Sequence, residues 1–204
     1  MISAMAPDPA AQDLDAWRSA ANYKELCELG ARFVEGDIGY FPGWLAADVD
    51  PETDALAADL AIFNRAGFLT LASQPGRAPS VGFGGHQFAQ RAFVAGFVTP
   101  QLAPSFDTLL ATELVVCSYP ATEGGGCRIP VGLRGGDVTS WAGHAAGPDE
   151  LEIFAEVLAP RTLSELRGCR YLSVVDPAWQ ERDLLWRALA TALSESTNGD
   201  RPSP

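Results

Sequence analysis

The stretch that most constrains the fold runs from residue 50 to residue 97, where a helix pattern is followed by two strand patterns. Asp50 and Pro51 precede apolar residues at helical spacing, and Gly67 follows them. An aspartate before a proline suits the start of a helix, and a glycine can take the left-handed conformation that ends one. The sequence therefore predicts a helix over 51–66.

Two apolar runs with strand character follow this helix, at 68–72 and 92–97. Each is bounded by glycine or by polar turn residues, which is typical of strands buried on at least one face. The segment between them shows no helical pattern, and parallel strands need a crossover connection. We therefore expect the two runs to be antiparallel neighbours.

In that arrangement four polar side chains lie at one end of the sheet: Ser73, Gln74, Gln90 and Arg91. An arginine can hold a carboxylate or phosphate with two hydrogen bonds, and glutamine amides can bind an amide or carbonyl edge. The cluster predicts a site for a small polar ligand. Alternatively, Gln74 only closes a turn and Arg91 pairs with an acidic neighbour.

Two carboxylates are the best candidates for acid–base chemistry. Asp37 lies in a glycine-bounded loop, and Asp176 lies between a buried strand and a helix pattern. Asp176 could equally serve only as a helix cap. Ser73 is a candidate nucleophile, although no G-x-S-x-G pattern surrounds it and only His86 and His144 are available as bases.

Aromatic and amide side chains complete the candidate substrate-binding set. Tyr40 and Trp44 belong to a loop rich in glycine, proline and aromatics, which either fills the core or forms one wall of a ligand pocket. Asn64 lies near the end of the helix predicted over 51–66, and Trp179 lies near the start of the last predicted helix.

These motifs also carry a family resemblance. The order Asn64–Phe68, Ser73–Gly76, Gln90–Ala92 and Val175–Pro177, followed by Trp179, resembles an uncharacterised domain family of actinomycete proteins. The resemblance extends over roughly residues 15–193 and brings no activity with it.

The remaining patterns predict a single domain of α/β or α+β class, with a mixed sheet of about five to six strands flanked by helices and one β-hairpin. Residues 13–194 form the domain, and 1–12 and 195–204 are expected to be disordered tails. A further helix is predicted over 23–34, with Asn22 and Glu25 as its cap, and another over about 99–111. Three more helices are predicted: one that begins at Gly147, a short one over 162–167 and one that begins at Asp176. The other predicted strands are 113–118, 169–175 and the two strands of the hairpin, 128–133 and 138–141.

The same periodicities predict which apolar side chains are buried. They are Leu56, Leu60, Phe63, Leu69, Leu71, Val94, Phe97, Val115, Leu172, Val174, Leu185 and Leu189.

Composition limits the partners. The 26 acidic and 14 basic residues give a net charge of −12, and the arginines are scattered, which disfavours nucleic acid and anionic membranes. We find neither a signal-peptide pattern nor a membrane-spanning run, so we expect a cytoplasmic protein. The sequence does not address its oligomeric state.

We identify neither a metal-binding motif nor a cofactor-binding motif in the sequence. The 4 cysteines have no C-x-x-C spacing, and we expect buried, reduced thiols. Gly82–Gly85 precedes a strand instead of following one, so it does not form a dinucleotide-binding loop. We expect this loop to be a mobile lid or a simple exposed loop, and we predict neither a metal nor a cofactor.

Two functional hypotheses follow from the sequence. The first is a cofactor-independent enzyme that acts on a polar metabolite or natural-product intermediate, with Asp37 or Asp176 as acid or base and with Arg91 and the glutamines positioning the substrate. The second is a non-catalytic ligand-binding or protein-interaction module. The sequence does not decide whether the protein is an enzyme.

Overall fold

The computed structural model describes residues 9–44, 51–82 and 85–199. Within these ranges the strands form two four-stranded antiparallel sheets, with helices packed mainly on the first. The class is α+β, and the expected single sheet of five to six strands is corrected to two sheets. The segment between the strands predicted at 68–72 and 92–97 forms two further strands, and both belong to the second sheet.

The first sheet has the order β1-β4-β8-β5. Its strands are β1 (Phe68–Gln74), β4 (Phe93–Val98), β5 (Val115–Pro120) and β8 (Arg170–Val175). β1 and β4 pair antiparallel, with Ser73 opposite Val94 and Gln74 opposite Phe93, so the predicted pairing is confirmed. β-branched and aromatic residues are common in these strands, above all in β4, which suits strand structure.

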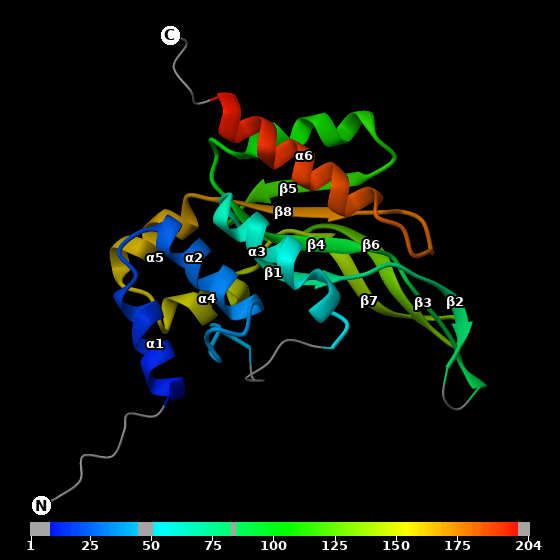
Figure 1. The fold of residues 1–204 in the computed structure, drawn as a ribbon, viewed down its shortest axis with the longest axis horizontal. Helices are drawn as coiled ribbons and strands as arrows, with labels where there is room; N and C mark the ends of the chain where they lie inside the picture. The colour runs from blue at the N-terminus through cyan, green and yellow to red at the C-terminus, as the bar shows by residue number, and fades with distance from the viewer. Residues whose placement is uncertain (1–8, 45–50, 83–84, 200–204) are drawn as a thin grey trace, which may run out of the picture.

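The second sheet has the order β2-β3-β6-β7. Its strands are β2 (Arg77–Val81), β3 (Gln87–Gln90), β6 (Gly126–Arg134) and β7 (Asp137–His144). The predicted hairpin is β6–β7. The predicted lid residues Gly82 and Gly85 belong to the turn between β2 and β3, and residues 83–84 lie outside the described ranges. The β2–β3 hairpin projects away from the helices (Figure 1).

Helices cover both faces of the first sheet. One face packs against α1 (Pro9–Ser19), α2 (Tyr23–Val34), α4 (Pro148–Ala155) and α5 (Pro160–Arg167). The other packs against α3 (Ala57–Arg65), η3 (Ala103–Ala111) and α6 (Leu184–Gly199). α6 lies across the top of Figure 1, and α1, α2, α4 and α5 gather at its left. A small third cluster of Val131, Ala142 and Val175 joins the two sheets.

Local sequence signals explain several helix ends. The side chain of Asn22 accepts a hydrogen bond from the Glu25 main-chain N–H, as the predicted cap of α2 requires. Gly67 follows α3 with a φ of +99°, the left-handed conformation expected there.

Other helix boundaries differ from the prediction. The predicted 51–66 helix is regular only over α3, after the short helix η1 (Asp54–Leu56), and the predicted 99–111 helix is the 3-10 helix η3. α1 begins at Pro9, inside the expected tail, and α6 runs to Gly199. Residues 1–8 and 200–204 lie outside the described ranges.

Burial agrees with the predicted core at all but two positions. Leu71 is half-buried and Val115 is 37% exposed, whereas the other ten predicted core residues are buried. Val115 lies on β5, the edge strand of its sheet, which accounts for its exposure. Among the described residues no helix has the length and apolar character to cross a membrane.

Candidate functional site

The predicted polar cluster lies where the two sheets meet. Gln74 is buried, and its Nε2 donates to the Arg91 carbonyl oxygen at 2.8 Å and to the Val131 carbonyl oxygen at 2.7 Å. The main-chain N–H of Arg91 also donates to the Val131 carbonyl at 2.9 Å. Gln74 therefore ties β1 to the start of β4 and to β6, and both donors of its amide are used within the fold.

Arg91 also bonds to main-chain oxygens. Its Nε donates to Pro177 O at 2.8 Å and its Nη1 to Pro130 O at 2.9 Å, and its Cζ lies 4.3 Å from the centre of the Trp179 ring. Burial lowers the pKa of Arg91, and the charge of Asp176 partly offsets that effect. In these contacts carbonyl oxygens and an indole ring surround the guanidinium, where the sequence had suggested Asp37 or a ligand carboxylate.

Asp176 forms an ion pair with Arg182. The two carboxylate oxygens accept from Arg182 Nε and Nη2, each at 2.5 Å, and Oδ1 also accepts from the Ala178 N–H at 2.9 Å. The last helix begins at Leu184, so Asp176 orders the turn that precedes it and does not cap it. This side chain is almost fully buried.

The remaining predicted site residues are dispersed. Asn64 is fully buried and links α3 to β1, because its Nδ2 donates to Leu60 O and Thr70 Oγ1 while its Oδ1 accepts from Thr70 N. Gln90 donates to Glu52 at 3.1 Å, and its Oε1 is buried without a partner among the described residues. Asp37 is exposed beyond the end of α2.

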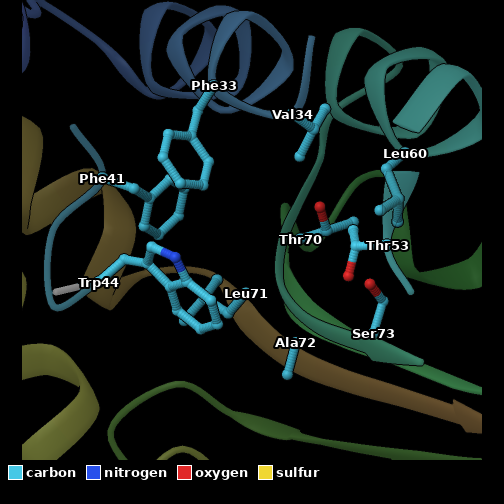
Figure 2. Close-up of a pocket in the computed structure, with 10 residues that line it drawn as sticks. All are labelled: Phe33, Val34, Phe41, Trp44, Thr53, Leu60, Thr70, Leu71, Ala72 and Ser73. Atoms are coloured by element: carbon cyan, nitrogen blue, oxygen red, sulfur yellow. The ribbon is translucent and has the colours of Figure 1, made fainter. Parts of the chain in front are cut away.

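Two predicted residues, Ser73 and Trp44, instead line a cavity of about 130 Å³ beside β1. Figure 2 shows Phe33, Phe41 and Trp44 along one side of it, facing Val34 and Leu60. The full lining is Phe33, Val34, Phe41, Trp44, Thr53, Leu60, Thr70, Leu71, Ala72 and Ser73.

A second cavity of about 260 Å³ adjoins the first and reaches the second sheet. The two cavities share four lining residues, Phe41, Trp44, Leu71 and Ala72. The second is also lined by Pro42, Gly43, Phe93, Ala95, Trp141, Ala142, His144, Glu150, Ile153, Phe154 and Tyr171. We call the two cavities together the aromatic groove.

Polar groups are concentrated at the two ends of the aromatic groove. At the first end the hydroxyls of Thr53 and Ser73 point toward one another (Figure 2). At the second end His144 Nε2 lies 3.6 Å from Glu150 Oε1, while Glu150 Oε2 accepts from the Gly147 N–H at 2.7 Å. That backbone bond holds Glu150 at the N-terminus of α4, facing the end of β7.

The comparison with protein families gives one match. A family model described as a domain of unknown function (DUF6919) matches residues 12–196. The chain belongs to this family. No curated protein matches the chain.

The buried hydroxyl of Tyr171, at the second end of the aromatic groove, remains protonated at neutral pH. Burial, together with the negative charge of Glu150, raises the pKa of Tyr171. Tyr171 therefore presents a neutral hydroxyl at neutral pH, next to His144, whose ring centre lies 6.1 Å from its own.

Sequence reasoning missed most of the groove. The aromatic loop suggested either a ligand-facing wall or a core-filling segment. Trp44 lines both cavities, whereas Phe41 is also packed against Trp17 in the core with ring centres 5.0 Å apart. Tyr40 is half-buried beside that core, and its main-chain oxygen accepts from Trp17 Nε1 at 3.0 Å. The second wall comes from β7 and α4, and no sequence pattern indicates that these elements face β1.

Metal-ligating side chains do not gather in the described ranges. No group of three or more histidine, cysteine, aspartate or glutamate residues there is placed to hold an ion.

Proposed function

We propose that this protein binds a small molecule with a flat, largely apolar part in the aromatic groove. The observation that carries the proposal is the pair of adjoining cavities that share Phe41, Trp44, Leu71 and Ala72. Ligand sites in proteins are concave and mostly apolar, with a few polar groups that fix orientation. The aromatic groove has this composition.

The aromatic side chains favour a flat ligand. Trp44 is 39% exposed and lines both cavities, so its indole forms part of the wall that they share. A planar molecule that stacks on an indole or phenyl ring buries a large apolar area with well-defined geometry. Such stacking supports an aromatic or heteroaromatic ligand over a flexible, highly charged one.

The polar ends favour a ligand with hydrogen-bonding groups at its periphery. Ser73 and Thr53 offer hydroxyls at one end, and the Tyr171 hydroxyl and the His144–Glu150 pair lie at the other. Glu150 also makes a basic or hydroxyl substituent more suitable at that end than a carboxylate, because like charges repel.

Binding is better supported than the acid–base reaction suggested by the sequence. The carboxylate of Asp176 is occupied by Arg182, and Asp37 is exposed outside both cavities' linings. The donors of Gln74 and Arg91 are directed at main-chain carbonyls. A role for these residues in holding the domain together is therefore the simpler proposal.

Acid–base chemistry on the bound molecule is a second candidate, and the His144–Glu150 pair favours it. A histidine that contacts a carboxylate is a common general acid or base in enzymes. His144→Gln would then abolish turnover of a bound compound while leaving its affinity within a few-fold of the wild type.

The test uses Nile red, a flat, uncharged dye whose fluorescence rises in apolar surroundings. Ala72 is exposed on β1 and lines both cavities, so Ala72→Trp fills the groove without requiring space in the core. We expect Ala72→Trp to weaken Nile red binding at least tenfold. Ala78→Trp, at an exposed position on β2, is the matched control and should bind as the wild type does.

Equal loss in both tryptophan variants, or in neither, would contradict the proposal. Arg91→Ala distinguishes binding in the aromatic groove from binding at the polar cluster around Arg91. We expect this variant to bind Nile red with unchanged affinity when measured well below its unfolding temperature. Compounds that displace the dye and raise the melting temperature then identify the ligand class, because a ligand that binds only the folded state stabilises it.

A further inference from the structure

Two cysteines from different sheets are in contact. Cys117 lies on β5 of the first sheet and Cys127 on β6 of the second, and their Sγ atoms are 3.0 Å apart. Both are free thiols, and Cys127 is exposed, contrary to the expectation of buried thiols throughout. A covalent sulfur–sulfur bond is about 2.05 Å long, so bond formation requires a movement of only about 1 Å.

We propose that Cys117 and Cys127 form a reversible modification site, at which a low-molecular-weight disulfide oxidises them to an internal disulfide that joins the two sheets. The connection between them includes Gly124, Gly125 and Gly126, the last two with φ of +98° and +93°. Glycine tolerates these left-handed conformations, so the connection can adjust when the sulfurs approach.

The local contacts hold Cys127 in position for this reaction. Its main-chain N–H donates to the Tyr119 hydroxyl at 3.2 Å, and its Sγ donates to the Gly143 carbonyl at 3.3 Å. A Cβ atom at Gly143 would lie 2.9 Å from this sulfur, so only a glycine leaves room for it there. The thiol is thereby kept next to Cys117 instead of turning to solvent.

Differences in exposure set the order of the steps. Cys127 is accessible to a solvent-borne oxidant, whereas burial, followed by the interaction with Cys127, raises the pKa of Cys117 to about 12. Cys127 therefore reacts first. Cys27 and Cys169 are buried, and burial raises the pKa of each to about 12, so both should remain inert.

The reaction consumes one molecule of oxidised glutathione as the probe oxidant. The Cys127 thiolate attacks one glutathione sulfur, forms a mixed disulfide and releases the first glutathione thiolate. Once Cys127 is in the mixed disulfide, it no longer contributes a negative charge that opposes ionisation of Cys117. The Cys117 thiol then loses its proton to solvent or to a released thiolate and attacks the Cys127 sulfur, expelling the second glutathione. The protein is oxidised by two electrons, and one glutathione disulfide is reduced to two thiols.

The sequence offers a direct assay on the full-length protein. After incubation with oxidised or reduced glutathione, free thiols are alkylated and the chain is cut after arginine and glutamate. Cleavage after Glu113, Glu123 and Arg128 separates the Cys117 fragment (114–123) from the Cys127 fragment (124–128). We expect the two fragments to remain joined after oxidation and to separate, both alkylated, after reduction.

Two variants make the result specific. Cys127→Ser should abolish the linked fragments, and Cys169→Ser should leave them unchanged. Because the cysteines are ten positions apart, the closed loop is short, and we expect oxidation to raise the melting temperature of the wild type by about 5–10 °C and that of Cys127→Ser not at all.

Either of two results would overturn the proposal. The first is full alkylation of both fragments after incubation with excess oxidised glutathione. The second is a linkage that involves Cys27 or Cys169, or that joins two chains.

Discussion

The amide of Gln74 and the guanidinium of Arg91 donate to main-chain oxygens because three chain segments converge around them. Their side-chain donors reach the carbonyls of Arg91, Val131, Pro130 and Pro177 at the meeting point of the two sheets, and the Val131 carbonyl also accepts from the Arg91 main-chain N–H. A buried carbonyl without a donor costs free energy, so long polar side chains that reach several carbonyls stabilise such a junction. The sequence reveals the side chains but not the carbonyls that they meet.

Replacing Gln74 tests this role. In Gln74→Ala two carbonyl oxygens lose a donor, and we expect the free energy of unfolding in urea to fall by about 1–3 kcal/mol. Gln87→Ala, at an exposed position on β3, is the matched control and should change it by less than about 0.5 kcal/mol. Equal losses of unfolding free energy in Gln74→Ala and Gln87→Ala would show that the Gln74 amide is not a structural link.

Asp176 provides a second residue-level test. In Asp176→Asn the Arg182 guanidinium loses its buried anionic partner, and we expect a loss of about 2 kcal/mol in the free energy of unfolding. Glu113 also pairs with Arg182, at 3.1 Å, but is largely exposed, so Glu113→Gln should cost less than about 0.5 kcal/mol. An Asp176→Asn protein of unchanged stability would return Asp176 to the list of candidate catalytic residues.

At the scale of elements, local signals were the most reliable. The Asn22 cap, the glycine stop at Gly67 and the antiparallel pairing of β1 with β4 follow from short-range patterns and are observed. β2 is exposed along its whole length, and β3 is short with a glutamine at each end, so neither shows the apolar run by which a strand is recognised. β3 pairs with β6, which lies far along the chain, and β2 joins the sheet only through β3.

The candidate site was predictable only in part for the same reason. Trp44 and Ser73 were expected to contact a ligand, and both line the aromatic groove. The groove itself depends on how α2, α4 and β7 approach β1, which is a matter of long-range packing. A polar cluster near a strand end is therefore an ambiguous indicator, because the same pattern suits a ligand site and a sheet junction.

Close packing between β1 and β4 can be tested at Gly96. A Cβ atom there would lie 2.0 Å from the Leu69 carbonyl oxygen, which is backbone and cannot move aside without disturbing the strand pair. We expect Gly96→Ala to lower the free energy of unfolding by about 2–3 kcal/mol. Gly124→Ala meets no atom within 4 Å and should stay within about 0.5 kcal/mol of the wild type, so equal melting temperatures for the two variants would contradict this account.

At the scale of the whole molecule, helices bury both faces of the first sheet, which therefore lies between the two large apolar clusters of the fold. The second sheet touches that core through the small cluster of Val131, Ala142 and Val175, and through the polar links at the sheet junction. The aromatic groove lies between these unequal parts, with β1 and β4 on one side and β7 on the other. Small shifts between the sheets would therefore change its width.

Buried thiols and phenols make the stability of the whole fold sensitive to alkaline pH. Burial raises the pKa of Cys27 and Cys169 to about 12, and it also raises the pKa of Tyr23 and Tyr171. An unfolded cysteine ionises near pH 8.5. Above that pH the unfolded chain holds fewer protons than the folded one, so ionisation favours unfolding.

The raised pKa values of the buried thiols therefore make the folded state less stable as the pH rises. The contribution of each buried thiol is complete below about pH 8.5 and is lost progressively as the pH rises toward about 12. Under reducing conditions, we expect the free energy of unfolding to fall between pH 9.5 and 10.5, with each buried thiol contributing up to about 1.4 kcal/mol per pH unit. Cys27→Ala should make that slope shallower by about this amount, whereas Cys127→Ser, at an exposed position, should leave more of the wild-type slope intact. Urea unfolding curves at several pH values measure the slope directly, and an unchanged slope in Cys27→Ala would mean that this thiol ionises as readily in the folded protein as in the unfolded chain.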